Sequence, residues 1–187
     1  MVTSMRRSLG HALSLVLILA MAFVFAGCAN LTLISYKDFK SALEETVGLK
    51  KDEYAVDKNT TKSGYDIKYS VTATVGNCIY RFYEFDDGDD AVDYFEDYYD
   101  DFDEMFKEGD FEGSYQMSYS SGGGSGYVLL NGKSRSSSNI FNMYTNKVYG
   151  GIYFKDNTVI IVAAGSSKES DAASIDEFLK SIDYPKP

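Results

Sequence analysis

Histidine is nearly absent from this 187-residue chain, because His11 is the only one. It lies in an N-terminal segment that we expect to be removed, so the mature protein would contain none. This excludes catalysis by Ser-His-Asp or Cys-His groups and metal sites built on histidine. The chain also lacks the Gly-x-Ser-x-Gly, Ser-x-x-Lys and Gly-x-x-x-x-Gly-Lys-Ser/Thr motifs. We therefore expect no catalytic residue, no metal and no cofactor, and predict that the protein is not an enzyme.

Cysteine is equally scarce, since the chain has only Cys28 and Cys78. Two cysteines cannot form the disulfide framework on which small secreted folds depend. Cys78 lies in the apolar stretch NCIYRFYEF, which favours a buried, inert thiol. The role of Cys28 depends on the residues before it.

The first 27 residues have the composition of a secretory signal. Residues 1–10 contain Arg6 and Arg7 and no acid, and residues 12–26 carry no charge. This apolar run is shorter than the roughly 20 residues that a membrane-spanning helix needs. A cleaved signal is therefore favoured over the alternative of a transmembrane anchor.

The stretch LAMAFVFAGCAN, residues 19–30, resembles the bacterial lipobox. In that motif small residues precede a cysteine that is lipidated and becomes the first residue of the mature chain. Ala26 and Gly27 fit it, whereas Phe25 stands where the pattern prefers leucine. The resemblance implies a fatty acyl anchor on Cys28, which would hold the protein at the extracytoplasmic face of the cell membrane. The alternative is cleavage elsewhere, with Cys28 incidental.

The mature chain of 160 residues has the length of one domain. We expect residues 28–34 to be a tether and residues 35–187 a single domain. The domain has 28 acidic residues against 16 basic ones, once Arg6 and Arg7 are excluded. Residues 84–112 alone hold 15 acids and one base, so the rest of the mature chain carries a net charge of +2. Such an acidic surface repels nucleic acid and anionic lipid headgroups.

Hydrophobic periodicity predicts an α+β fold. A helix is expected over residues 35–47, capped by Ser35 with Asp38 and ended by Gly48. A short strand near 54–56 precedes a hairpin, whose turn Gly76-Asn77 would place Val75 opposite Cys78. The stretch DDGDDAVDYFEDYYDDFDEMFK then gives the strongest helix signal, with apolar residues three or four positions apart.

The second half of the chain predicts three or four more antiparallel strands and a final helix. A weak edge strand would come first, and turns are expected at 131–132, 146–147 and 156–157. NTVIIVAA is apolar throughout, as in a central strand covered on both faces. Ser167 or Ser170 would cap the last helix. The whole predicts an antiparallel sheet of about five to seven strands packed with three helices, with a possible αββ-type duplication.

The chain resembles a group of small uncharacterised lipoproteins of Gram-positive bacteria. The resemblance is carried by the lipobox, a strand ending in FYEF, the helix with Ala91 and Phe95, the strand NTVII and a last helix ending in DY. It covers most of the mature chain. It implies a fold and a cellular location, and it supplies no catalytic motif.

Two groups of residues are candidate binding sites. The first is the acidic side of the predicted helix, which could dock a cationic protein, peptide or polyamine; its residues are Asp93, Glu96, Asp97, Asp100 and Glu104. The alternative is a solvated face that keeps the protein soluble. The second group consists of three tyrosines around a glycine-rich loop: Tyr115, Tyr119 and Tyr127. They would be either exposed aromatic contact residues or side chains that anchor the loop. The acids at 86–90 fit a helix N-terminus better than a calcium loop.

These observations predict a membrane-anchored extracytoplasmic lipoprotein that acts as a non-enzymatic binding or interaction module. Two alternatives remain open. One is a small carboxylate-dependent hydrolase of the cell envelope, since paired carboxylates can act as acid and base. The other is a purely structural envelope component. A solute-binding protein that closes two domains around its ligand is excluded by the length of the chain.

Overall fold

The computed structural model describes residues 31–120 and 124–187. The predicted signal peptide, Cys28 and the middle of the glycine-rich loop lie outside these ranges. The described chain is an α+β fold with one seven-stranded antiparallel sheet and three helices, which confirms the predicted fold class. In chain order the elements are α2 (Tyr36–Ala42) continued by the π-helical turn η1 (Leu43–Val47), β1 (Ala55–Lys62), β2 (Tyr65–Val75), β3 (Cys78–Phe85), α3 (Gly88–Lys107), β4 (Phe111–Ser120), β5 (Ser125–Ile140), β6 (Met143–Lys155), β7 (Thr158–Ala164) and α4 (Glu169–Ser181).

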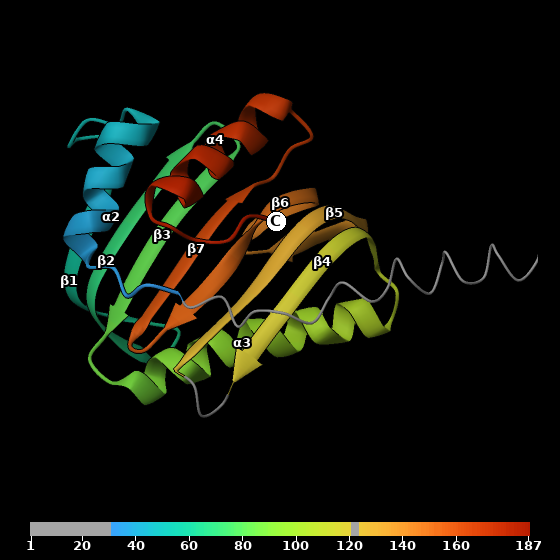
Figure 1. Cartoon of the computed structure of the whole chain (residues 1–187). Helices are drawn as coiled ribbons and strands as arrows, with labels where there is room; N and C mark the ends of the chain where they lie inside the picture. Colours follow the sequence, from blue (N-terminus) through green and yellow to red (C-terminus); the bar gives the residue numbers. More distant parts are fainter. Residues whose placement is uncertain (1–30, 121–123) are drawn as a thin grey trace, which may run out of the picture.

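The sheet consists of two meanders that meet at its centre. The strand order is β1-β2-β3-β7-β6-β5-β4, so the last strand in sequence joins the two halves. All seven residues of β7 are buried, as its apolar sequence predicted. A helix precedes each meander, but α2 and α3 cover opposite faces of the sheet (Figure 1). Both β3 and β6 run antiparallel to β7, so a two-fold axis along β7 would exchange the two meanders and also the two faces, which brings α2 to the side of α3. The arrangement is compatible with the αββ-type duplication considered above.

The helices divide the apolar residues into two cores, one on each face of the sheet (Figure 1). On one face α2 and α4 meet, and the rings of Phe39 and Phe178 pack edge to face with centroids 5.1 Å apart. On the other face α3 lies across the sheet, and Phe95 stacks on Phe154 of β6 at 5.6 Å. The acidic helix is therefore separated from the other two helices by the whole thickness of the sheet.

The first hairpin has the register that the sequence predicted. Val75 pairs with Cys78, Ala73 with Tyr80 and Val71 with Phe82. Gly76 has a φ of 58°, which the predicted tight turn requires. β1 is longer than the short strand expected near residues 54–56. Cys78 is a buried free thiol, as predicted.

Two of the three turns predicted in the second half are wrong. Residues 131–132 lie inside β5 and residues 146–147 inside β6, whereas 156–157 is a turn. Gly132 serves close packing, because a Cβ there would lie 2.4 Å from the carbonyl oxygen of Glu112. The β5–β6 turn falls instead at Phe141 and Asn142, both with positive φ.

A bulge in β5 bends the tip of this hairpin toward α3. The pairing with β6 shifts between Lys133 and Ser138, and such irregularities bend a strand. Phe141 at the tip then packs against Phe102 of α3 with centroids 5.2 Å apart. Arg81 of β3 donates a hydrogen bond to the Phe141 carbonyl at 2.7 Å. The tip therefore covers the sheet beside α3.

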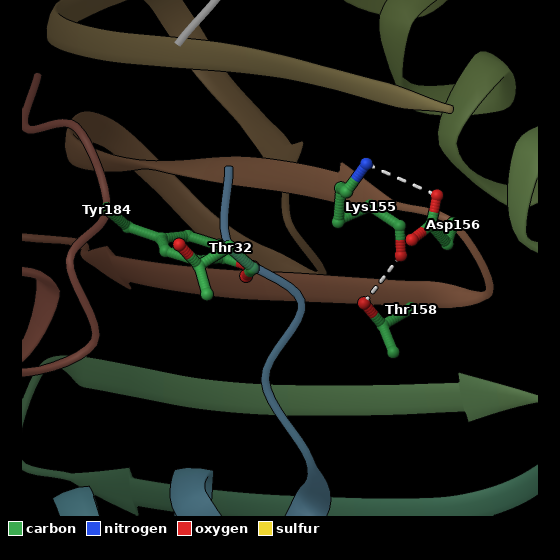
Figure 2. Close-up of polar contacts among 5 residues, drawn as sticks. All are labelled: Thr32, Lys155, Asp156, Thr158 and Tyr184. Carbon is green, nitrogen blue, oxygen red and sulfur yellow. Dashed lines mark hydrogen bonds and ion pairs between the residues drawn. The ribbon is translucent and has the colours of Figure 1, made fainter. Parts of the chain in front are cut away.

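The two ends of the described chain meet on the face opposite α3. The Tyr184 hydroxyl donates a hydrogen bond to the Thr32 carbonyl at 2.8 Å, and Figure 2 shows the two residues side by side over the sheet. Leu31 and Ile34 are buried, so part of the segment expected to be a tether, 28–34, belongs to the core. Any free linker after Cys28 therefore ends at residue 30.

The caps predicted for the first helix are confirmed, whereas the N-cap predicted for the last helix is wrong. Ser35 and Asp38 form the predicted reciprocal capping box, and Gly48 ends the first helix in the left-handed region. At α4 neither predicted serine caps the helix, because Lys168 is the N-cap residue and makes no side-chain cap. In the described part of the chain, no helix has the length and apolarity needed to cross a membrane.

Candidate functional site

Helix α3 separates its apolar and acidic residues onto opposite sides, as predicted. The side chain of the N-cap residue Asp87 accepts a hydrogen bond from the backbone N–H of Asp89 at 3.0 Å. Acids in the first turn also interact favourably with the positive end of the helix dipole. The residues buried against the sheet are Ala91, Tyr94, Phe95 and Phe102. Burial of this stripe orients the acids of the helix toward solvent.

Four of the five predicted face residues are exposed: Asp93, Asp97, Asp100 and Glu104. The fifth, Glu96, is half-buried and accepts a hydrogen bond from the Tyr119 hydroxyl at 2.6 Å. Burial, and then this bond to Glu96, raises the pKa of Tyr119 to about 12. Glu96 therefore ties α3 to the edge strand β4. The other four acids form the acidic face of α3, as the name is used below.

Within the described residues, none of the four acids of the acidic face forms an ion pair with a base. Lys107 is the only base among residues 84–112, and it pairs with Asp103 on the same helix. Asp97 accepts a hydrogen bond from the neutral Tyr65 hydroxyl at 3.1 Å, which leaves its charge in place. A concentrated negative field at an exposed surface attracts cations and speeds their encounter.

A pocket of about 220 Å³ lies beside the acidic face. Three separate parts of the chain form it: α3, the β1–β2 turn and the tip of the β5–β6 hairpin. Its lining residues are polar or aromatic: Ser63, Tyr94, Asp97, Tyr98, Asp101, Asn139 and Asn142. Asn142 donates a hydrogen bond to the Tyr98 hydroxyl at 3.0 Å, which holds the hairpin tip against the helix.

The pocket has the chemistry of a site for an ammonium or guanidinium group. Carboxylates accept charge-assisted hydrogen bonds from such groups, and tyrosine rings attract cations through their faces. Burial, and then the charges of Asp97, Glu104 and Asp100, raises the pKa of the Asp101 carboxyl. A bound cation would relieve this repulsion between carboxylates.

Sequence analysis missed this pocket and Asp101. Asp97, Tyr98 and Asp101 lie three, four and seven residues after Tyr94, so all four share one side of α3. That spacing was a usable signal. No signal in the sequence placed Asn139 or Asn142 beside them, because only the bulge in β5 brings the hairpin tip there.

The three predicted aromatics occupy three different environments. Tyr115 is 53% exposed, although its ring stacks on Phe106 with centroids 3.7 Å apart. Tyr119 is half-buried. Tyr127 is only 3% exposed, and its hydroxyl accepts a hydrogen bond from Gln116 at 2.8 Å, so it is not the exposed contact residue considered above. Side chains alternate between the two faces along β5, and that of Tyr127 belongs to the core beneath α2 and α4.

Two negative findings accompany this geometry. Within residues 31–120 and 124–187, no group of three or more acidic, histidine or cysteine side chains is arranged to hold a metal ion. Comparisons of the chain with protein families, curated proteins and solved structures gave no match. Function is therefore inferred from the geometry described above and from the N-terminal sequence.

Proposed function

We propose that this chain is a membrane-tethered extracytoplasmic lipoprotein that acts as a non-enzymatic binding module. Its ligand is a cationic protein or peptide, which docks on the acidic face of α3. A lysine or arginine side chain of the ligand enters the adjacent pocket. The observation that carries the proposal is the juxtaposition of uncompensated carboxylates with a pocket that contains Asp97, Asp101 and two tyrosine rings.

The location rests on the N-terminal sequence. Ala26-Gly27-Cys28 follows a signal-like apolar run, and the lipobox pattern places a lipid on the cysteine. Two or more acyl chains hold a protein stably on a membrane, whereas one does not. Cys28→Ala should therefore move the protein from the membrane fraction to the soluble fraction. Recovery of that variant with membranes at the wild-type level would refute the anchor.

The binding proposal can be tested with an oligolysine peptide as the probe. The variant D93N/D97N/D100N/E104Q removes four charges from the acidic face and keeps an acceptor oxygen at each position. Its affinity for the probe in calorimetry should fall about tenfold, which corresponds to ~1.4 kcal/mol. Added salt should weaken wild-type binding because exposed charges are screened.

A matched control removes four exposed charges from the face that carries α2 and α4. These residues are Glu45, Glu169, Glu177 and Asp183, each replaced by its amide. The control has the same net charge as the α3 variant, so it should bind the probe with nearly wild-type affinity. Equal losses in the two variants would mean that only net charge matters, and the acidic face would not be a docking site.

One observation favours a second candidate, a carboxylate-dependent hydrolase. Asp97 and Asp101 line one pocket, and the pKa of Asp101 is raised, as expected of a general acid. However, glycosidases place their two carboxyl groups on either side of the bond that breaks, whereas these two lie four residues apart on one side of a helix. Release of reducing ends from peptidoglycan, lost in D97N and in D101N, would support the hydrolase instead.

A further inference from the structure

The N-terminal residues of the described chain lie on the side of the sheet opposite the acidic helix. Leu31 is 5% exposed and belongs to the core beneath α2 and α4. The hydrogen bond from Tyr184 to Thr32 fixes the next residue of this segment (Figure 2). The Tyr184 ring in turn packs on Tyr153 of β6 with centroids 5.2 Å apart. The point at which the chain leaves the fold is therefore rigidly placed.

Only three peptide units separate Leu31 from Cys28, the proposed site of the lipid. A fully extended chain spans at most about 3.6 Å per residue, so the two Cα atoms lie within about 11 Å of each other. This limit follows from covalent geometry alone. An anchor on Cys28 therefore keeps Leu31 close to the bilayer surface.

The acidic face of α3 lies farther from Leu31 than this tether can span. The sheet lies between them (Figure 1). Layers of secondary structure pack about 10 Å apart, and a helix with its side chains is about 10 Å across, so the separation is about 20 Å. If the acidic face lay on the bilayer, Leu31 would be held too far above it for the tether to reach.

Charge and apolar exposure favour the same orientation. Residues 84–112 have a net charge of −14, which anionic headgroups repel, whereas α2, η1 and α4 together carry only −4, so the face that they cover meets much weaker repulsion. Leu33 is 49% exposed although its neighbours Leu31 and Ile34 are buried. An exposed leucine two residues beyond the core contact of the tether is well placed to meet the headgroup region.

We infer that the domain sits on the bilayer with the face that carries α2 and α4 toward the lipid and Leu33 against the headgroups. The acidic face of α3 then points away from the membrane, open to a partner from outside. This inference rests on the lipid anchor proposed at Cys28, and it does not depend on which ligand α3 binds.

The test uses the intact lipoprotein in vesicles of phosphatidylethanolamine and phosphatidylglycerol. In a Cys78→Ser background, one fluorophore is attached at Leu33→Cys or at Asp100→Cys, both exposed positions. Lipids with a nitroxide on the headgroup should quench the label at position 33 several-fold more strongly than the label at position 100. Equal quenching, or stronger quenching at position 100, would overturn the orientation. A label at position 33 that is shielded from solvent but not quenched by lipid would assign this face to a protein contact, and it would also overturn the orientation.

A lengthened tether provides the control. An insert of about 20 Gly and Ser residues between Asn30 and Leu31 adds a mean reach of about 25 Å. The variant should still float with the vesicles, but the difference in quenching should shrink severalfold. If the difference is unchanged, the short tether does not set the orientation. Flotation separates the two proposals: protein that does not float refutes the anchor, whereas floating protein with equal quenching refutes only the orientation.

Discussion

Gly150 of β6 lies directly against Ala163 of β7, its partner across the centre of the sheet. A Cβ atom built on Gly150 would lie 2.3 Å from the Cα of Ala163, closer than any real contact allows. It would lie equally close to the carbonyl oxygen of Val162. Both are backbone atoms of a fully buried strand, so neither can move aside cheaply.

We therefore expect Gly150→Ala to lower the free energy of unfolding by about 3 kcal/mol, the upper part of the usual range for overpacking. Gly165→Ala is the matched control, because its nearest neighbours would lie at an ordinary 3.5 Å. Urea unfolding followed by circular dichroism measures both variants. Equal stability of the two would mean that the β6–β7 contact is looser than described.

The contact between the chain ends gives a second prediction. Tyr184→Phe keeps the ring in the core but removes the hydrogen bond to Thr32, so unfolding should require about 1 kcal/mol less. Amide hydrogen exchange should also become faster in the segment before α2. Tyr144→Phe, at a ring that is 82% exposed, should change neither quantity.

The capping box predicts an effect that depends on pH. Ser35→Ala removes the hydroxyl that bonds Asp38, and loss of such a cap costs about 1 kcal/mol at neutral pH. The bonds from Ser35 lower the pKa of Asp38, so this carboxylate stabilises the fold above its unfolded pKa, about 4. The stabilisation is lost as the pH falls through the lower folded value. The difference between wild type and variant should therefore shrink at pH 3, as measured by urea unfolding, and a constant difference would contradict the argument.

At Asp101 of α3, partial burial and then the repulsion of neighbouring acids predict a pH effect on stability of the opposite sign. The pKa of Asp101 is raised, so the folded protein holds this proton more tightly than the unfolded chain, and ionisation weakens the fold as the pH rises. Asp101→Asn should stabilise the protein at pH 7 by about 0.4 kcal/mol, the size of one like-charge helix pair. The gain should disappear near pH 3, where the wild-type residue is protonated. Asp57→Asn on β1 should show no such gain.

Local patterns in the sequence predicted most of the fold. The alternation in β2 and the turn at Gly76 determine a hairpin register, because a slip of one residue would expose its apolar face. The helix period predicted α3 for the same reason. The turn expected at Asn131-Gly132 failed because this glycine accommodates the ring of Phe111 from a neighbouring strand, and a single-sequence pattern contains no such information.

The candidate site was less predictable than the fold. The exposed acids of α3 follow from the helix period. The pocket also needs Ser63, which the distant β1–β2 turn brings to the helix, and Asn139, which the bent β5–β6 hairpin brings there. The environment of Tyr127 depended on which face of β5 the helices α2 and α4 cover, and that is a property of the whole fold. Contacts between elements far apart in sequence therefore account for what sequence analysis missed.

The position of β7 has a consequence for when folding can finish. Both β3 and β6 pair with it, so neither meander can join the other until residues 158–164 are present. A chain that is exported starting from its N-terminal signal would hold two incomplete half-sheets with open edges until β7 emerged, with only α4 still to follow. The sheet cannot close earlier, because the strand that completes its centre is the last of its strands to be delivered.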